Sequence, residues 1–226
     1  MRFATRTCST MIGALIAGML AAAPASAASL TVNGALFGDQ VYVQSAGRTG
    51  WVRPAELNVT IAGNRMFAYC VDLAQNIGIG GSSGWTIVDA DTHAGVLKAA
   101  WLVEYARPQF ELLAGDYSGA TRATLISALQ VSIWEVMAEL PGNYNLYAGA
   151  FSLRSDTSAN VMNLARGFLG ALGGADLAAF ETSALWARHG TRQDQVAFNP
   201  IPEPSSIALF AAGAALVAYA GRKKLA

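Results

Sequence analysis

Between residues 30 and 88 hydrophobic and polar positions alternate in short runs, the pattern that is typical of β-strands. Turn-forming residues such as Ala62-Gly63-Asn64 separate the runs. The predicted strands lie at 30–32, 40–44, 51–52, 57–61 and 65–73. A stretch rich in glycine and serine at 78–84 is predicted to be a loop.

Side chains in a strand point alternately to its two faces. In the predicted strand 65–73, Ala68, Cys70 and Asp72 therefore share one face, and Tyr69 and its neighbour Val71 share the other.

Helical spacing takes over near residue 92. Helices are predicted at 93–106, 119–140 and 157–172, with Pro108 just past the end of the first. The second has a core-facing stripe with steps of three and four: Leu125, Leu129, Ile133, Val136, Met137 and Leu140. Residues 183–198 return to strand-like alternation. We therefore expect an α+β body, with a β-sandwich or barrel-like sheet and an inserted helical subdomain.

Gln130 stands out in the second predicted helix because it shares a face with Ile133 and Trp134. A buried amide without hydrogen-bond partners costs on the order of 1–3 kcal/mol. We therefore expect Gln130 to have a specific role beyond packing.

Both ends of the 226-residue chain have the composition of targeting segments. Residues 1–27 combine a basic start, an apolar run and Ala25-Ser26-Ala27, the pattern of a secretory signal peptide. At the other end, the uncharged residues 205–221 precede Arg222, Lys223 and Lys224. A helix of that length measures about 25 Å, which predicts a single transmembrane helix with its basic end in the cytoplasm.

The body between these segments, residues 28–199, holds one cysteine and an acidic excess of about four charges. Cys8 leaves with the signal peptide, so Cys70 has no partner for an internal disulfide. A single exported cysteine indicates intermolecular pairing, a reactive thiol, or a buried thiol that acts as a small hydrophobe. An acidic body without a basic run argues against a nucleic acid partner.

The tail from about residue 200 resembles the PEP-CTERM sorting signal. Pro202, Glu203 and Pro204 match its Pro-Glu-Pro motif, and a transmembrane run and a basic end follow in the family's order. The resemblance implies that an exosortase processes the chain near the motif. It also implies an exported surface protein of a Gram-negative bacterium that makes extracellular polysaccharide and biofilm.

Residues 35–150 resemble the thioester domains of bacterial surface adhesins. In that family a strand cysteine that follows an aromatic residue, here Tyr69-Cys70, is joined to a helical glutamine four residues before a tryptophan, here Gln130 and Trp134. The resemblance implies that Cys70 and Gln130 condense into an internal thioester. The family usually has a threonine before the glutamine, and this chain has Leu129.

Such a bond needs sulfur and carboxamide carbon about 3–3.5 Å apart in a pocket that excludes water. A strand and a packed helix can hold them so, with Tyr69, Ile133 and Trp134 as the expected shield. The thioester would acylate an amine or hydroxyl of a surface polysaccharide or protein, once per molecule. We therefore predict a covalent adhesion or matrix-attachment module, not an enzyme, and no cofactor or metal.

Two alternatives remain open. Cys70 could act as the nucleophile of a hydrolase with His93 or His189 and an aspartate, Asp89 or Asp91, although the local sequence has no nucleophile signature. The acids before His93 also loosely resemble a metal cluster, but acids before a helix are more typical of N-terminal caps. Alternatively Cys70 is inert, and the chain is a non-covalent surface or biofilm matrix protein.

Overall fold

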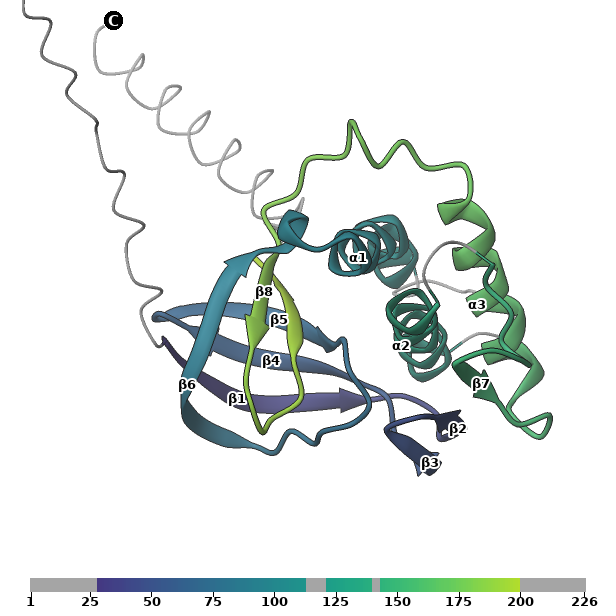
Figure 1. The fold of residues 1–226 in the computed structure, drawn as a ribbon, viewed down its shortest axis with the longest axis horizontal. Coiled ribbons are helices and arrows are strands. Elements are labelled where there is room, and N and C mark those ends of the chain that lie inside the picture. The colour runs from purple at the N-terminus through teal and green to yellow at the C-terminus, as the bar shows by residue number, and fades with distance from the viewer. Residues whose placement is uncertain (1–27, 113–120, 140–142, 200–226) are drawn as a thin grey trace, which may run out of the picture.

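The computed structural model in Figure 1 describes residues 28–112, 121–139 and 143–199. The predicted signal peptide 1–27 and the predicted sorting segment, with its transmembrane helix 205–221, lie outside the described residues. Within the described ranges, no helix is both long and apolar enough to cross a bilayer.

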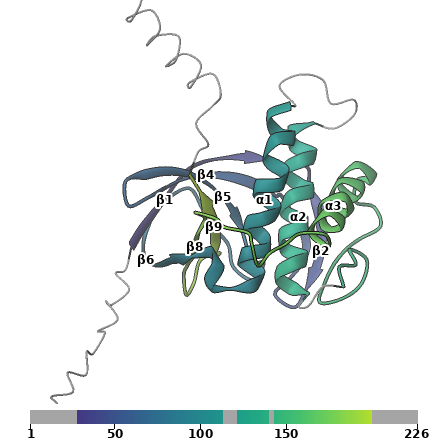
Figure 2. The same ribbon diagram turned by 90° about the horizontal axis from the view of Figure 1, so that it is seen from above.

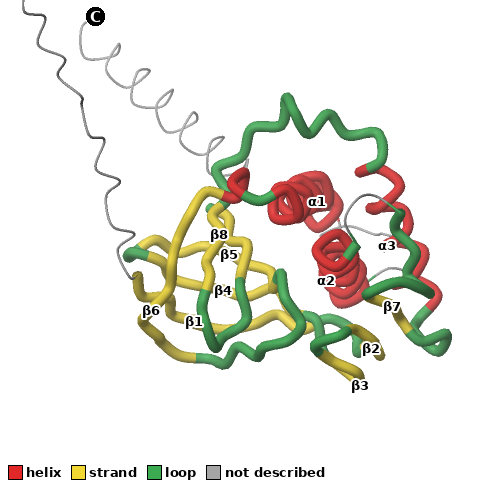
Figure 3. Tube along the Cα trace, viewed as in Figure 1, coloured by secondary structure: helices red, strands yellow, loops and turns green. Residues whose placement is uncertain are grey.

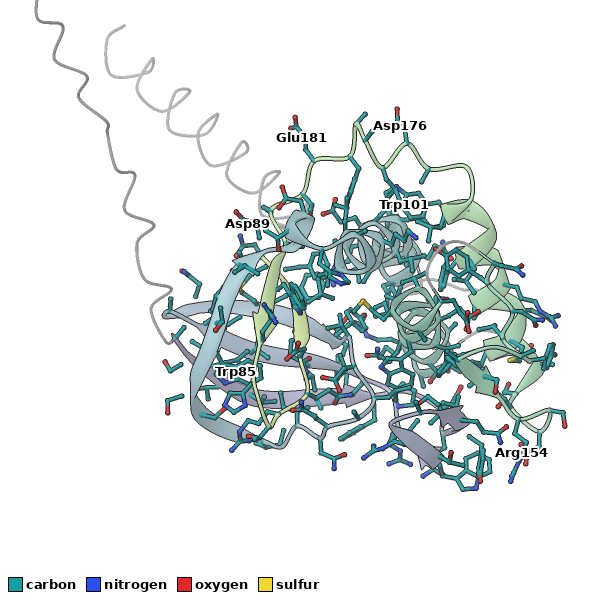
Figure 4. All side chains as sticks on the ribbon, in the orientation of Figure 1. Trp85, Asp89, Trp101, Arg154, Asp176 and Glu181 are labelled. Carbon is teal, nitrogen blue, oxygen red and sulfur yellow. The ribbon has the colours of Figure 1, made fainter. Side chains whose placement is uncertain are left out.

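Six antiparallel strands close into a barrel in the order β1–β4–β5–β9–β8–β6. Their bounds are β1 (Ala28–Phe37), β4 (Ala55–Ile61), β5 (Asn64–Cys70), β6 (Gly80–Asp89), β8 (Leu185–Arg188) and β9 (Gln195–Phe198). β6 closes the ring by pairing with β1, where Trp85 lies opposite Ala28. Alternating side chains from all six strands form one hydrophobic cluster, in which Trp85 is fully buried (Figure 4).

The helices form a second layer beside the barrel (Figures 1 and 2). They are α1 (Ala94–Leu112), α2 (Arg122–Ala138) and α3 (Ala159–Leu172), and the short 3₁₀-helix η1 (Ala90–Thr92) leads into α1. A small sheet with the order β3–β2–β7 contacts α2 through β7; its strands are β2 (Val41–Ser45), β3 (Arg48–Val52) and β7 (Phe151–Leu153). All helices of the described residues (red in Figure 3) follow β6 and precede β8 in the chain, which confirms the expected insertion of helices between β segments.

The central element is α2, which contacts α1, α3, β7 and three barrel strands. Every residue from Thr124 to Val136 is buried, so the helix is enclosed on all sides and not only along the predicted apolar stripe. Thr121 caps its N-terminus by accepting a hydrogen bond from the backbone of Thr124 at 3.2 Å. The segment after β1 passes so close that a Cβ on Gly38 would lie 2.2 Å from Oγ of Ser127. A glycine there lets α2 dock directly against the barrel.

The structure moves several predicted boundaries. The strand predicted at 65–73 already ends at Cys70. Most of the predicted loop 78–84 belongs to β6, where Gly81 pairs with Thr31 of β1. Strand pairing uses main-chain groups, so a run of glycine and serine can form it when a neighbouring strand is in place. The first helix also continues through Pro108 to Leu112. Proline removes one hydrogen bond of the helix, and the burial of Phe110 in the helical core offsets that loss.

Candidate functional site

Cys70 is the last residue of β5, at a place where the strand has lost one of its two neighbours. The pairing of β5 with β4 ends at Ala68, opposite Leu57. The pairing with β9 continues to Cys70, opposite Gln195. The backbone N–H and C=O of Cys70 are therefore left without a strand partner on the β4 side.

Gln130 of α2 takes the place of that strand. Its Oε1 accepts a hydrogen bond from the backbone N–H of Cys70 at 3.1 Å, and its Nε2 donates to the backbone O of Cys70 at 2.6 Å. Only one orientation of the amide satisfies both bonds, so the carboxamide is fixed against the cysteine. The structure thus brings Cys70 and Gln130 into direct contact, in a region where Gln130 is fully buried and Cys70 is 7% exposed.

The side chain of Cys70 lies on the barrel side of β5. Ala68 and Cys70 belong to the barrel cluster, whereas Tyr69 and Val71 belong to the helical core, as the alternation along the strand predicts. Gln195 of β9 contacts the sulfur: its Nε2 lies 3.4 Å from Sγ of Cys70.

Gln195 is fully buried, and its Oε1 has no hydrogen-bond partner among the described residues. Nε2 of Gln195 also donates to the backbone O of Gln193 at 2.8 Å. The sequence analysis missed Gln195, although a glutamine at the start of the apolar run Gln195–Phe198 is the same kind of signal that drew attention to Gln130.

The environment of the thiol opposes its ionisation. Burial raises the pKa of Cys70 to about 12; the hydrogen bond from Gln195 opposes this rise, and the carboxylate of Asp72 adds to it. Cys70 is therefore protonated at neutral pH, unlike the activated thiolate of a cysteine hydrolase.

A cavity of about 370 Å³ adjoins both residues and opens to solvent. Cys70, Gln130 and Trp134 line it together with Gln193 and with residues of β1, β3, β4 and the loops after β3 and β5. Trp134 also lines a second cavity of about 340 Å³. It is 5% exposed, and its Nε1 has no hydrogen-bond partner among the described residues. Trp134 therefore shields the site in part, and its buried indole N–H has no acceptor among the described residues.

The other expected shielding residues lie elsewhere. Tyr69 and Ile133 are buried in the helical core and do not line the cavity beside Cys70, and the same is true of Leu129. The alternation of β5 turns Tyr69 away from the sulfur, and its hydroxyl donates to Oε2 of Glu56 at 2.6 Å.

Glu56 links this tyrosine to both long helices. Its carboxylate pairs with Arg122 at 3.0 Å and with Arg107 at 3.7 Å. Burial and the adjacent Glu56 carboxylate hold the pKa of Tyr69 well above its usual range. Tyr69 therefore contributes to the site indirectly, because it joins β5 to α1 and α2.

The hydrogen bonds of the two histidines go to main-chain groups. Nδ1 of His93 accepts from the backbone N–H of Gly95 and Val96 at the start of α1. Nδ1 of His189 accepts from the backbone N–H of Thr191 at 3.1 Å, and its Nε2 lies 3.0 Å from the backbone O of Ser83. Both imidazoles thus bind main-chain groups.

The acidic pair before α1 does not form the loosely suggested cluster. Asp89 occupies the N-cap position of η1 but makes no side-chain capping hydrogen bond, and Asp91 is exposed. Within the described ranges, no three histidine, cysteine or acidic side chains lie close enough to hold a metal ion.

Residues 200–224 match the family model of the PEP-CTERM protein-sorting motif. The matched segment contains Pro202, Glu203 and Pro204 as well as Arg222, Lys223 and Lys224. This motif marks an exported, envelope-associated protein that an exosortase sorts. Comparison of the chain with curated proteins and with solved structures finds no match.

Proposed function

We propose that this exosortase substrate forms an internal thioester between Sγ of Cys70 and Cδ of Gln130 and uses it to bind a surface target covalently. The observation that carries the proposal is the pair of hydrogen bonds between the Gln130 carboxamide and the main chain of Cys70. The reacting carbon is bonded to both atoms that make these contacts, so it is held against the backbone from which the thiol projects.

One torsion then decides whether sulfur and carbon meet. With the backbone and the carboxamide fixed, only rotation about χ1 of Cys70 moves its sulfur, and χ1 has three staggered positions. The hydrogen bond from Gln195 to Sγ favours one of them. This restriction is the kind of pre-organisation that an otherwise slow condensation needs.

The main chain of Cys70 can also assist the reaction. When sulfur adds to Cδ of Gln130, negative charge develops on Oε1, and the backbone N–H of Cys70 already donates to that oxygen. The C–N bond then breaks, the thiol proton passes to Nε2, and ammonia leaves. The product is a neutral thioester, which a buried site tolerates better than a thiolate.

The stored acyl group is then transferred once. An amine or hydroxyl that enters the cavity attacks Cδ of Gln130, the C–S bond breaks, and the proton of the nucleophile passes to Sγ of Cys70. The target remains attached to Gln130 through an amide or an ester. Because the thioester is not regenerated, the module is a single-use adhesion or matrix-attachment device and not an enzyme.

The intact mass of the exported protein tests this proposal. We expect a mass lower by one ammonia than the sequence requires, a Cys70 that resists alkylation, and restoration of the free thiol by methylamine with addition of one amine to Gln130. Cys70→Ala should have the mass of its sequence. Gln44→Ala, at an exposed glutamine of β2, is the matched control and should keep the deficit. A full sequence mass in the untreated protein would falsify the thioester.

A non-covalent surface-binding module is the second candidate. The raised pKa of Cys70 favours it, because a protonated, buried thiol is a poor nucleophile. In that case the exported protein has its full sequence mass, and Cys70 reacts with alkylating agents only on unfolding.

A further inference from the structure

The rim of the cavity beside Cys70 carries exposed apolar side chains. Phe37, Trp51 and Ile79 line it, and each is between 53% and 67% exposed. They are three of the six large hydrophobic side chains that the described part of the chain leaves exposed. Exposed apolar groups gathered at a cavity are typical of a ligand-binding surface.

The same rim carries positive charge without compensation. Arg48 and Arg53 line the cavity, and none of its described lining residues has a carboxylate. The ion pairs within the described ranges use Arg107, Arg122 and Arg154 instead. Because the body as a whole has an acidic excess, the positive potential at this rim is a local feature.

Uncharged neighbours restrain both guanidinium groups. Nη2 of Arg48 donates to Oδ1 of Asn76, and the guanidinium carbon of Arg53 lies 5.7 Å from the ring centroid of Phe37. Restrained arginines with free N–H groups are well suited to bind a carboxylate in a bidentate manner.

These charges discriminate between the two classes of nucleophile that a thioester can acylate. A lysine ammonium that approaches Cys70 meets two guanidinium groups of the same sign and is repelled. A hydroxyl carries no charge, and a carboxylate on the same molecule would be attracted. The exposed part of Trp51 offers an apolar surface to the C–H groups of a sugar ring.

We infer that the acceptor is a hydroxyl group of an acidic polysaccharide of the uronate type, bound by Arg48 and Arg53 and stacked on Trp51. This inference rests on the proposed thioester. The hydroxyl oxygen attacks Cδ of Gln130, the C–S bond breaks, and the hydroxyl proton passes to Sγ. The products are a sugar ester of Gln130 and the free thiol of Cys70.

Oligogalacturonate tests the inference, with a cello-oligosaccharide of the same length as the neutral control. Two measurements are made on the full chain: the mass of the covalent adduct, and non-covalent binding to Cys70→Ala, which cannot react. We expect an adduct and binding with oligogalacturonate, both at least tenfold weaker in the double variant Arg48→Ala/Arg53→Ala. Arg65→Ala removes an exposed arginine elsewhere on β5 and should change neither.

The two measurements separate the possible failures. A protein with the ammonia deficit that binds both oligosaccharides equally, or reacts faster with a lysine peptide, overturns the inference and leaves the thioester intact. A protein without the deficit refutes the thioester and with it the ester-forming step. Binding of oligogalacturonate by Cys70→Ala that the arginine variants do not weaken also overturns the assignment of this rim.

Discussion

The carboxamide of Gln130 bonds both main-chain polar groups of Cys70, at 3.1 and 2.6 Å, and so completes the edge of a strand from within a helix. This relationship joins the two layers of the molecule at the point where the barrel ladder between β4 and β5 has ended. A residue expected to supply an acyl group thus also satisfies buried backbone groups, and the two roles can be separated by mutation.

Gln130→Ala should destabilise the protein more than Cys70→Ala. The first leaves the buried N–H and C=O of Cys70 without partners and costs about 2–4 kcal/mol. The second removes only a thiol and keeps the main-chain contacts, at a cost of about 1 kcal/mol. Urea unfolding of both variants measures the difference. Equal losses would show that the two hydrogen bonds contribute little to stability.

Gln195→Met should lower the yield of thioester while leaving the fold stable. The substitution removes the donor to Sγ of Cys70 and to the backbone O of Gln193, and it also removes a buried Oε1 that has no partner among the described residues, so the effects on stability partly offset. Without the hydrogen bond, χ1 of Cys70 is free to leave the rotamer that Gln195 holds, which the proposed condensation takes as the reactive one. Intact mass gives the fraction that has lost ammonia, and thermal unfolding reports stability.

Gln193→Met is the matched control for this prediction. Gln193 is two residues away and donates to the backbone O of Asp72, not to the sulfur. A similar loss of thioester in both variants would mean that Gln195 acts only through the local packing of the β8–β9 connection.

Stability should fall as pH rises from about 4.5 to about 7 because of Glu135. Burial raises the pKa of Glu135 from 4.5 to about 7, and the nearby Glu139 adds to the rise, while a hydrogen bond from the backbone N–H of Asn145 opposes it. The folded state therefore holds this proton more tightly than the unfolded state. The contribution of Glu135 to stability is complete below pH 4.5 and is lost as pH rises through the folded-state pKa of this carboxyl.

Glu135→Gln keeps an acceptor for Asn145 and removes the titration. Between pH 4.5 and pH 8, the free energy of unfolding of the variant should rise relative to that of the wild type by up to roughly 3 kcal/mol. Denaturant unfolding at several pH values measures this gain. Parallel pH profiles for the two proteins would contradict the assignment.

Glu56→Gln should cost about 2–4 kcal/mol of stability, because it leaves Arg107 and Arg122 without their carboxylate. Tyr69→Phe removes only one hydrogen bond to that carboxylate and should cost about 1–2 kcal/mol. Arg154→Gln breaks the exposed surface pair with Asp156 and serves as the control, with the smallest change of the three. Chemical denaturation ranks the three, and an unchanged Glu56→Gln would show that this network does not hold the layers together.

The sequence predicts the features that depend on local periodicity. Alternation along β5 places Cys70 and Tyr69 on opposite faces, and helical spacing places Gln130 among core residues, as the structure confirms. Gln195 could not be placed in this way, because its contact with Cys70 depends on the pairing of β9 with β5 across 125 residues of sequence. The start of β6 at Gly80 could not be predicted for the same reason. Pairing with β1, and not the local pattern of side chains, makes this segment a strand.

Strand β9 ends at Phe198, two residues before the sorting segment, and it is flanked by β5 on one side and β8 on the other. Tension between a surface anchor and a target fixed to Gln130 would enter the domain through this strand. Because the strand lies inside a closed ring, pulling it out requires both neighbouring ladders to fail together. A tether on a free edge could instead unzip one hydrogen bond at a time, so the barrel suits this chain to mechanical load.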